Sequence, residues 1–122
     1  LLILSAKFYF EPEGDSDSII KTTKANLKSR LTSQPYHLPS FGSVFKNPYN
    51  DYAGKLIEET GLKGIKYGGA EISAMHANFI VNTSSATSAD ILNLINLVQQ
   101  KVIQKKGILL HPEVRMIGFD YP

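Results

Sequence analysis

The sequence of 122 residues contains no cysteine. This absence excludes disulfide bonds, thiol catalysis and metal sites with cysteine ligands. The chain also lacks an uncharged apolar run of about 20 residues, which a transmembrane helix needs. The net charge is only +2, and the bases are not gathered as a nucleic-acid-binding surface requires. We therefore expect neither a membrane nor a nucleic acid as a partner.

Composition and length together favour one folded domain. Hydrophobic residues make up 43% of the chain and charged residues 20%, a balance typical of globular proteins. A length of 122 residues suits a single domain. Strand and helix patterns are mixed without regular βαβ repetition. The sequence therefore predicts an α+β fold, a single compact domain with a small mixed sheet and packed helices.

Three segments carry the signals of helices. They are residues 18–31, 53–60 and 88–106. The third signal is strongest, because four apolar residues recur along it at helical spacing. Thr87 and Asp90 can form a capping box at its start, and Gly107 can end it. Asp15 or Ser16 is expected to cap the first helix by accepting hydrogen bonds from its free amides.

The strand signals are shorter. The opening residues 1–10, LLILSAKFYF, alternate in a way that predicts a buried β-strand, and a chain that opens inside a strand suggests a piece of a longer protein. Residues 33–51 contain three prolines and predict a loop with a short strand at 44–45. The remaining predicted strands are one or two within 62–74 broken by Gly68-Gly69, one at 79–82, and a pair at 108–110 and 114–117.

Two stretches contain residues suited to chemistry. In residues 39–48, Ser43 follows a glycine and can present its hydroxyl from a tight turn, while Lys46 and Asn47 offer donors to a phosphate, carboxylate or sugar. The alternative is an anchored loop in which Ser43 bonds only to backbone. In residues 111–115, Glu113 is either functional or a surface carboxylate paired with Arg115. The three histidines lack metal-binding spacing, and no phosphate-binding glycine loop is present.

A series of short motifs, in fixed order, covers about residues 30–118. The motifs are Gln34-Pro35, LPSFGSVFKNP at 38–48, AGKLIE at 53–58, GLKG at 61–64, GGA at 68–70, HA at 76–77 with FIVN at 79–82, and HPEVRMIG at 111–118. Each motif is weak alone, but the ordered combination is specific. The chain resembles the C-terminal part of the UDP-N-acetylenolpyruvoylglucosamine reductase family.

The resemblance implies an activity and a missing part. The family reduces UDP-N-acetylglucosamine enolpyruvate to UDP-N-acetylmuramate, in the cytoplasm, for peptidoglycan synthesis and cell-wall biogenesis. NADPH reduces a bound FAD, and the flavin passes hydride to the alkene. By resemblance, residues 1–14 are the last strand and exit of an N-terminal FAD-binding domain, and residues 15–122 are the substrate-binding domain. The missing domain is the expected partner, and this chain alone should bind no cofactor.

The resemblance also implies roles for five residues. Ser43 matches the family's proton donor, and Glu113 matches a second catalytic residue that helps to orient or polarise the enolate. Asn47 matches a contact to the substrate's nucleotide. Lys46 is a candidate for the diphosphate, and His76 sits where the family places polar residues near the ligand. One departure is Phe41, which stands where the family more often has a small residue, so details of affinity are in question.

Two other classes of function stay open at this point. One is a non-catalytic nucleotide-sugar binding or regulatory module that retains the fold. The other is a small RNA-binding domain, because FGSVF weakly resembles an aromatic RNA-binding strand. The chain does not match the full pattern of such a strand, and salt-dependent RNA binding would be needed to support that hypothesis.

Overall fold

The computed structural model describes residues 2–10 and 14–118. The chain divides between Arg30 and Leu31 into two compact units. Within the described ranges, no helix is both long and apolar enough to span a lipid bilayer.

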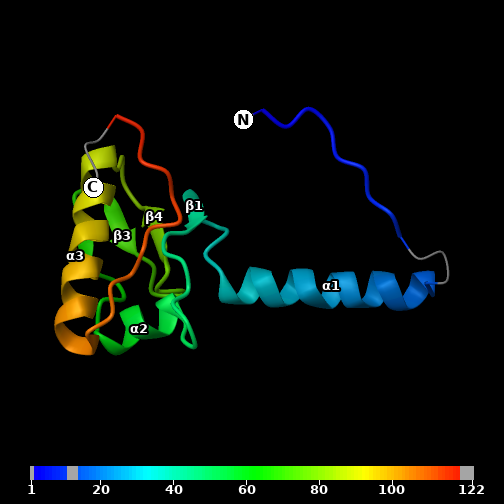
Figure 1. The fold of residues 1–122 in the computed structure, drawn as a ribbon, viewed down its shortest axis with the longest axis horizontal. Coiled ribbons are helices and arrows are strands. Elements are labelled where there is room, and N and C mark those ends of the chain that lie inside the picture. Colours follow the sequence, from blue (N-terminus) through cyan, green and yellow to red (C-terminus); the bar gives the residue numbers. More distant parts are fainter. Residues whose placement is uncertain (1, 11–13, 119–122) are drawn as a thin grey trace. The chain divides into compact units, whose positions relative to one another are not determined.

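The second unit contains a four-stranded sheet (Figure 1). Its strands are β1 (Ser40–Ser43), β2 (Lys66–Tyr67), β3 (Ala70–Ile72) and β4 (Phe79–Asn82), in the order β1-β4-β3-β2. The predicted α+β class is confirmed. All three pairings are antiparallel, so the sheet is antiparallel rather than mixed. The predicted break at Gly68-Gly69 is the turn between β2 and β3.

The residues that the structure describes form three helices. They are α1 (Ser16–Ser33), α2 (Ala53–Glu59) and α3 (Ser88–Lys106). Helix α3 runs beside β3, and its C-terminal end lies next to α2 (Figure 1). Helix α1 buries none of its residues, and its predicted cap is confirmed because the Asp15 carboxylate accepts from the Asp17 and Ser18 amides.

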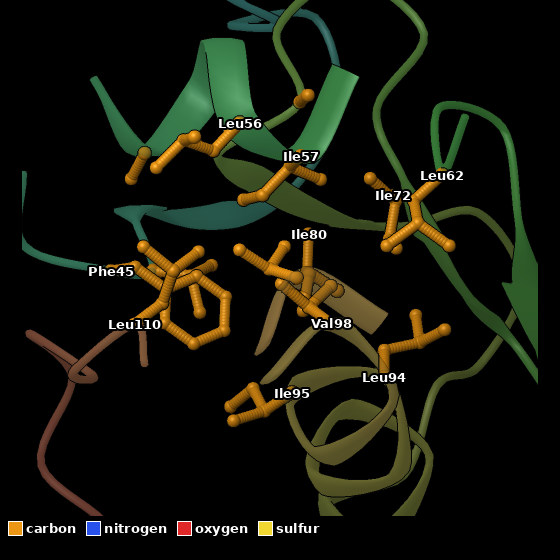
Figure 2. Packing of buried hydrophobic residues seen from close by; sticks show 14 of the residues in the cluster. Phe45, Leu56, Ile57, Leu62, Ile72, Ile80, Leu94, Ile95, Val98 and Leu110 are labelled. Atoms are coloured by element: carbon orange, nitrogen blue, oxygen red, sulfur yellow. The ribbon is translucent and has the colours of Figure 1, made fainter. Parts of the chain in front are cut away.

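The hydrophobic core lies between α2, α3 and the sheet (Figure 2). Leu56 and Ile57 enter it from α2, as their spacing predicts. The α3 side chains that enter it are Leu94, Ile95, Val98 and Val102. Phe45, from the loop after β1, is 2% exposed and joins the same cluster. The core therefore fixes the loop that carries the candidate functional residues.

The two ends of α3 are defined by the residues that the sequence indicates. Thr87 accepts from the Asp90 amide at 3.1 Å, and the Asp90 carboxylate accepts from the Thr87 amide at 2.9 Å, which completes the capping box. Gly107 ends the helix with φ of 68°, the left-handed conformation that glycine adopts most easily.

Removal of this cap should weaken the fold measurably. We expect Thr87→Ala to lower the free energy of unfolding by about 1 kcal/mol, because one amide of the first turn loses its acceptor. Urea unfolding followed by circular dichroism measures the change. Ser88→Ala is the matched control, since the described structure gives the Ser88 hydroxyl no hydrogen bond; equal losses in both variants would contradict a role for the cap.

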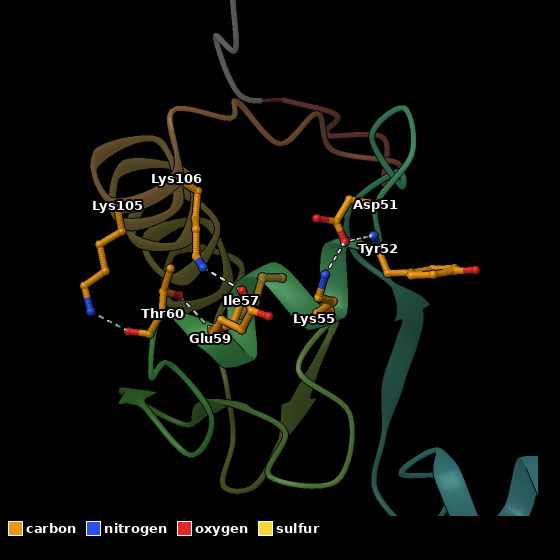
Figure 3. Close-up of polar contacts among 8 residues, drawn as sticks. All are labelled: Asp51, Tyr52, Lys55, Ile57, Glu59, Thr60, Lys105 and Lys106. Atoms are coloured by element: carbon orange, nitrogen blue, oxygen red, sulfur yellow. Dashed lines mark hydrogen bonds and ion pairs between the residues drawn. The ribbon is translucent and has the colours of Figure 1, made fainter.

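Lysines at the C-terminal end of α3 hold the end of α2 (Figure 3). The Lys106 ammonium pairs with the Glu59 carboxylate at 2.6 Å, and the Lys105 ammonium donates to the Thr60 carbonyl at 2.9 Å. The second contact gives the Thr60 carbonyl a hydrogen-bond donor at the C-terminal end of α2, where a positive charge is favourable. These contacts fix the C-terminal end of α2 against α3.

The prediction of a buried strand at residues 1–10 is wrong for the residues that the structure describes, 2–10. They form no regular element, and Phe8 and Phe10 are 73% and 85% exposed. A β-strand needs a neighbour to satisfy its backbone groups, and the described structure pairs nothing with this segment. Alternation alone therefore gave no basis for predicting burial.

Two further strand predictions are wrong in their positions. In place of the strand expected at 44–45, β1 begins four residues earlier and ends two residues earlier, and Phe45 forms only an isolated bridge with Pro112. Residues 108–110 and 114–117 form no strand pair. The bridge explains the error, because residues 111–113 pair with residues 44–46 instead of turning back on their own neighbours.

Candidate active site

A β-bulge positions Ser43. In the pairing of β1 with β4, Ser40 faces Val81 and Ser43 faces Phe79, so two residues of β1 oppose one residue of β4. Gly42 lies within this irregularity at φ of 85°, a conformation that glycine tolerates and other residues rarely adopt. The extra residue reverses the alternation of the following side chains. The Gly-Ser pair therefore sets the direction of the Ser43 side chain.

An antiparallel bridge brings Glu113 to the same place. The Lys46 amide donates to the His111 carbonyl at 2.9 Å, and the Glu113 amide donates to the Val44 carbonyl at 2.8 Å. Phe45 and Pro112 face each other between these two bonds. At this position the pairing of the two segments uses no backbone N–H of either residue. Proline is therefore accepted here, and Glu113 is fixed beside the residue that follows Ser43.

Four of the five predicted site residues line one cavity of about 380 Å³. They are Ser43, Asn47, His76 and Glu113. A further hollow, of about 340 Å³, also has both Ser43 and Glu113 in its wall. Lys46 does not line this cavity. It lines a neighbouring cavity of about 860 Å³, whose wall also contains Asn47. The structure thus brings a hydroxyl and a carboxylate together and places Lys46 at the neighbouring cavity.

Asn47 has a structural contact in addition to its place in the cavity wall. Its Oδ1 accepts from the Ala53 amide at 3.0 Å, at the start of α2. The neighbouring Tyr52 provides no side-chain cap. The Asn47 Nδ2 has no hydrogen-bond partner among the described residues, so it is available as a donor to a ligand.

His76 is held as a neutral ring with a defined tautomer. Its Nδ1 accepts from the Asn78 amide at 3.3 Å, so the ring proton lies on Nε2. The ring packs edge-on against Phe79, with centroids 4.9 Å apart. A Cβ at Gly54 would lie 3.2 Å from the His76 Cε1, so this glycine gives the ring room beside α2. Burial, the largest cause, lowers the pKa of His76.

This pKa gives a titration with a defined sign. The ring should lose its proton with a midpoint below the ordinary 6.5, because burial disfavours the charged form. The folded protein then binds fewer protons than the unfolded chain in that window, so stability rises with pH through it and falls on acidification. Nitrogen-15 NMR of the ring measures both midpoint and tautomer. A midpoint at or above 6.5, or a neutral ring protonated at Nδ1, would contradict this description.

The cavity wall carries charges of both signs. Lys55 and Glu58 from α2 contribute, but each already has a partner: Lys55 pairs with Asp51 at 3.3 Å and Glu58 with Lys63 at 2.8 Å. Among the described residues, Glu113 has no ion-pair partner, and the surface pair with Arg115 does not form. Glu113 is therefore the carboxylate in this wall that is free to act on a ligand.

Sequence reasoning missed one residue at this site, Asn78. It is 4% exposed, lines the cavity and bonds to the loop after Ser43. The only signal in the sequence was a single amide side chain between Ala77 and the apolar run at residues 79–81. A buried polar side chain needs hydrogen-bond partners, but the sequence does not show which partners those are.

The polar side chains of the described residues determine which ligands the site can bind. In the ranges 2–10 and 14–118, no three histidine, aspartate or glutamate side chains gather as a metal site requires. The polar groups in the cavity wall include the Ser43 hydroxyl, the unpaired Glu113 carboxylate, the Asn47 side-chain amide and the His76 imidazole. These groups suit hydrogen bonding and proton transfer to a polar ligand.

Comparisons with a family model and with curated proteins indicate the same family. The family described as the C-terminal domain of UDP-N-acetylenolpyruvoylglucosamine reductase matches residues 34–117. A reductase of that name from Prochlorococcus marinus subsp. pastoris is 70% identical over 122 residues, and one from a Synechococcus strain is 56% identical over 119 residues. These matches cover 100% and 98% of this chain but 41% and 40% of the relatives.

A solved structure supports the same fold. The crystal structure of UDP-N-acetylenolpyruvylglucosamine reductase from Thermus caldophilus superposes with a TM-score of 0.67 at 36% sequence identity. The similarity covers 81% of this chain and 34% of that one. The chain thus spans about two fifths of the length of the curated relatives named above.

Proposed function

Because the chain belongs to the family of UDP-N-acetylenolpyruvoylglucosamine reductase C-terminal domains, we propose that it is the substrate-binding and proton-donating part of such a reductase. The substrate is UDP-N-acetylglucosamine enolpyruvate, and the product is UDP-N-acetylmuramate. The reaction serves peptidoglycan precursor synthesis, and we place it in the cytoplasm. The relatives are named as reductases, so a non-catalytic nucleotide-sugar module is not favoured.

One observation supports this proposal most strongly. Ser43 and Glu113, which are 70 positions apart in the sequence, line the same cavity together with Asn47 and His76. The bulge at Gly42 and the bridge at Phe45 hold the first two in place. A proton donor, a carboxylate and two ligand-facing donors in one cavity are what an addition to a polar alkene requires.

Ser43 has the chemistry of the acid. Hydride addition to the methylene carbon of the enolpyruvyl group leaves a carbanion, delocalised as an enolate, at the carbon beside the carboxylate. An alcohol is a feeble acid, but this species is a strong base. The Ser43 O–H bond breaks as the new C–H bond forms, and the alkoxide regains its proton from water. Positioned proton transfer of this kind contributes roughly 10²–10⁴ in rate.

The other residues bind and orient. Glu113 lies beside the reacting end, where we propose that it orients or polarises the enolate. The Asn47 Nδ2 donates to the nucleotide, and Lys46, in the neighbouring cavity, offers a charge to the diphosphate. The His76 Nε2–H donates as a neutral group, because the Nδ1 is occupied by the Asn78 amide.

The reductant belongs to the part of the protein outside this chain. FAD, reduced by NADPH, supplies the hydride when bound in the N-terminal domain. We propose the domain boundary at residue 14, with residues 15–122 as the substrate domain. Both the FAD-binding domain and the UDP-sugar are thus partners of this chain, and the isolated chain is expected to be inactive.

The test is an assay of the full-length protein that contains this chain. We expect NADPH consumption to depend on UDP-N-acetylglucosamine enolpyruvate and to match the UDP-N-acetylmuramate formed, one for one. Plain UDP-N-acetylglucosamine is the matched control ligand, because it lacks the alkene. Equal NADPH consumption with both ligands, without UDP-N-acetylmuramate, would overturn the proposed function.

A further inference from the structure

Asn78 makes an unusual set of hydrogen bonds at the edge of the site. Its Oδ1 accepts from the Phe45 amide, and its Nδ2 donates to the Phe45 carbonyl, both at 2.9 Å. Its own carbonyl accepts from the Val44 amide at 2.9 Å. Since a backbone donor and a backbone acceptor of one residue face the amide, the orientation of its oxygen and nitrogen is fixed.

This arrangement makes the Asn78 side chain act as a short piece of β-strand. The pairing of β1 with β4 ends where Ser43 faces Phe79. Beyond that point the amide of Asn78 continues the ladder, with one donor and one acceptor for the next backbone unit. On its other edge, the same unit is bridged to residues 111–113. Residues 44–46 therefore lie between the Asn78 amide and the segment that carries Glu113.

The contacts reach three of the candidate site residues. Val44, which follows Ser43, bonds to the Asn78 carbonyl through its amide and to the Glu113 amide through its carbonyl. The backbone N–H of Asn78 donates to the His76 Nδ1. Loss of the Asn78 side chain would leave the Phe45 amide and carbonyl unpaired in a buried place, which is unfavourable. Residues 44–46 would then move so that water could reach the Phe45 amide and carbonyl, and Ser43 and Glu113 would move with them.

We propose that Asn78 is a positioning residue, which holds the Ser43 hydroxyl and the Glu113 carboxylate in register for proton transfer. This inference rests on the proposed function. Asn78 is buried and acts through Phe45 and Val44, so its role differs from that of the groups that would touch the substrate. A displacement of about 1 Å at a reacting group is enough to cost on the order of 10² in rate.

The variant Asn78→Asp tests this with a pH signature. A carboxylate still accepts from the Phe45 amide but repels the Phe45 carbonyl, whereas a protonated carboxyl can satisfy both. We therefore expect the rate constant for reoxidation of the pre-reduced flavin by substrate to fall on the order of 10²-fold at neutral pH. The ratio to wild type should recover as the pH is lowered. Stopped-flow absorbance of the full-length protein measures it.

A matched control is available at the far end of β4, the strand that Asn78 precedes. Asn82 is half-buried, and its Oδ1 accepts from the Ala86 amide at 3.0 Å, but the described structure shows no acceptor for its Nδ2. Asn82→Asp keeps that hydrogen bond as a carboxylate, so its rate constant should match wild type at every pH. Other titratable groups line the cavity of Asn78: Tyr52, Lys55, Glu58, His76 and Glu113. Division by the wild-type rate at each pH removes their common effect.

The readouts separate positioning from stability and from the proposed function. A variant that only unfolds loses reaction amplitude, while its remaining molecules keep the wild-type rate constant. A wild-type rate constant in Asn78→Asp at neutral pH, or a loss without recovery in acid, would overturn the proposal. Wild-type protein that is not reoxidised by substrate contradicts the proposed function itself. Amide NMR shifts of Val44, Phe45 and Glu113 in this chain then still report whether Asn78 holds both segments.

Discussion

Ser43→Ala in the full-length protein should slow the formation of UDP-N-acetylmuramate by roughly 10²–10⁴, while NADPH still reduces the flavin at the normal rate. The reason is that flavin reduction needs no proton from Ser43, whereas completion of the product does. The loss corresponds to about 3–5 kcal/mol of transition-state stabilisation. Stopped-flow absorbance separates the two steps, because the flavin bleaches in the first and regains its colour in the second.

The matched control for this experiment is Ser84→Ala. Ser84 is exposed, its hydroxyl has no hydrogen bond in the described structure, and it lies outside both cavity walls that contain Ser43. It should leave both steps unchanged. Normal product formation by Ser43→Ala would remove Ser43 from the mechanism. Equal slowing of flavin reduction and product formation would show that the substitution disturbs the whole site rather than the proton transfer.

The second large effect is expected at Phe45, which anchors the site loop in the core. Phe45→Ala should lower the free energy of unfolding by about 3–5 kcal/mol, because the ring is 2% exposed and its removal leaves a cavity. A loss of that size is a large part of the roughly 5–15 kcal/mol that stabilises a typical domain. Urea denaturation followed by circular dichroism gives the value.

Tyr49 provides the comparison within the same loop. It is also aromatic but is 94% exposed, so Tyr49→Ala should change the free energy of unfolding by no more than about 0.5 kcal/mol. The contrast tests whether burial, rather than aromatic character, ties this loop to the core. Similar losses for the two variants would contradict the placement of Phe45.

The elements that could be predicted from the sequence are those with local signals. Helix α3 has both a capping box and an apolar stripe, and its bounds match the prediction. The predicted strand at 79–82 also matches, because its apolar run is bounded by polar residues. The prediction of a C-terminal strand pair was wrong because the true partner of this segment, residues 44–46, is 67 positions away along the chain. No local pattern shows a partner at that separation.

In the candidate site, too, local motifs could be recognised in the sequence, whereas contacts between distant segments could not. Ser43, Asn47 and Glu113 were selected by their motifs. The residues alone left open a backbone-bonded Ser43 in an anchored loop and a surface Glu113 paired with Arg115. Their common cavity depends on the bulge at Gly42 and on the bridge opposite Pro112, which are properties of pairing rather than of composition. Asn78 was missed because its partners are backbone atoms 33 positions away.

The most direct test of the central claim is a crystal structure of the full-length protein with UDP-N-acetylglucosamine enolpyruvate bound. We predict that the enolpyruvyl group lies in the cavity between Ser43 and Glu113. The Ser43 Oγ should then lie within about 3.5 Å of the carbon that accepts the proton, the separation of a near-attack geometry. An enolpyruvyl group bound elsewhere, with Ser43 facing bulk water, would contradict the assignment of this chain as the proton-donating domain.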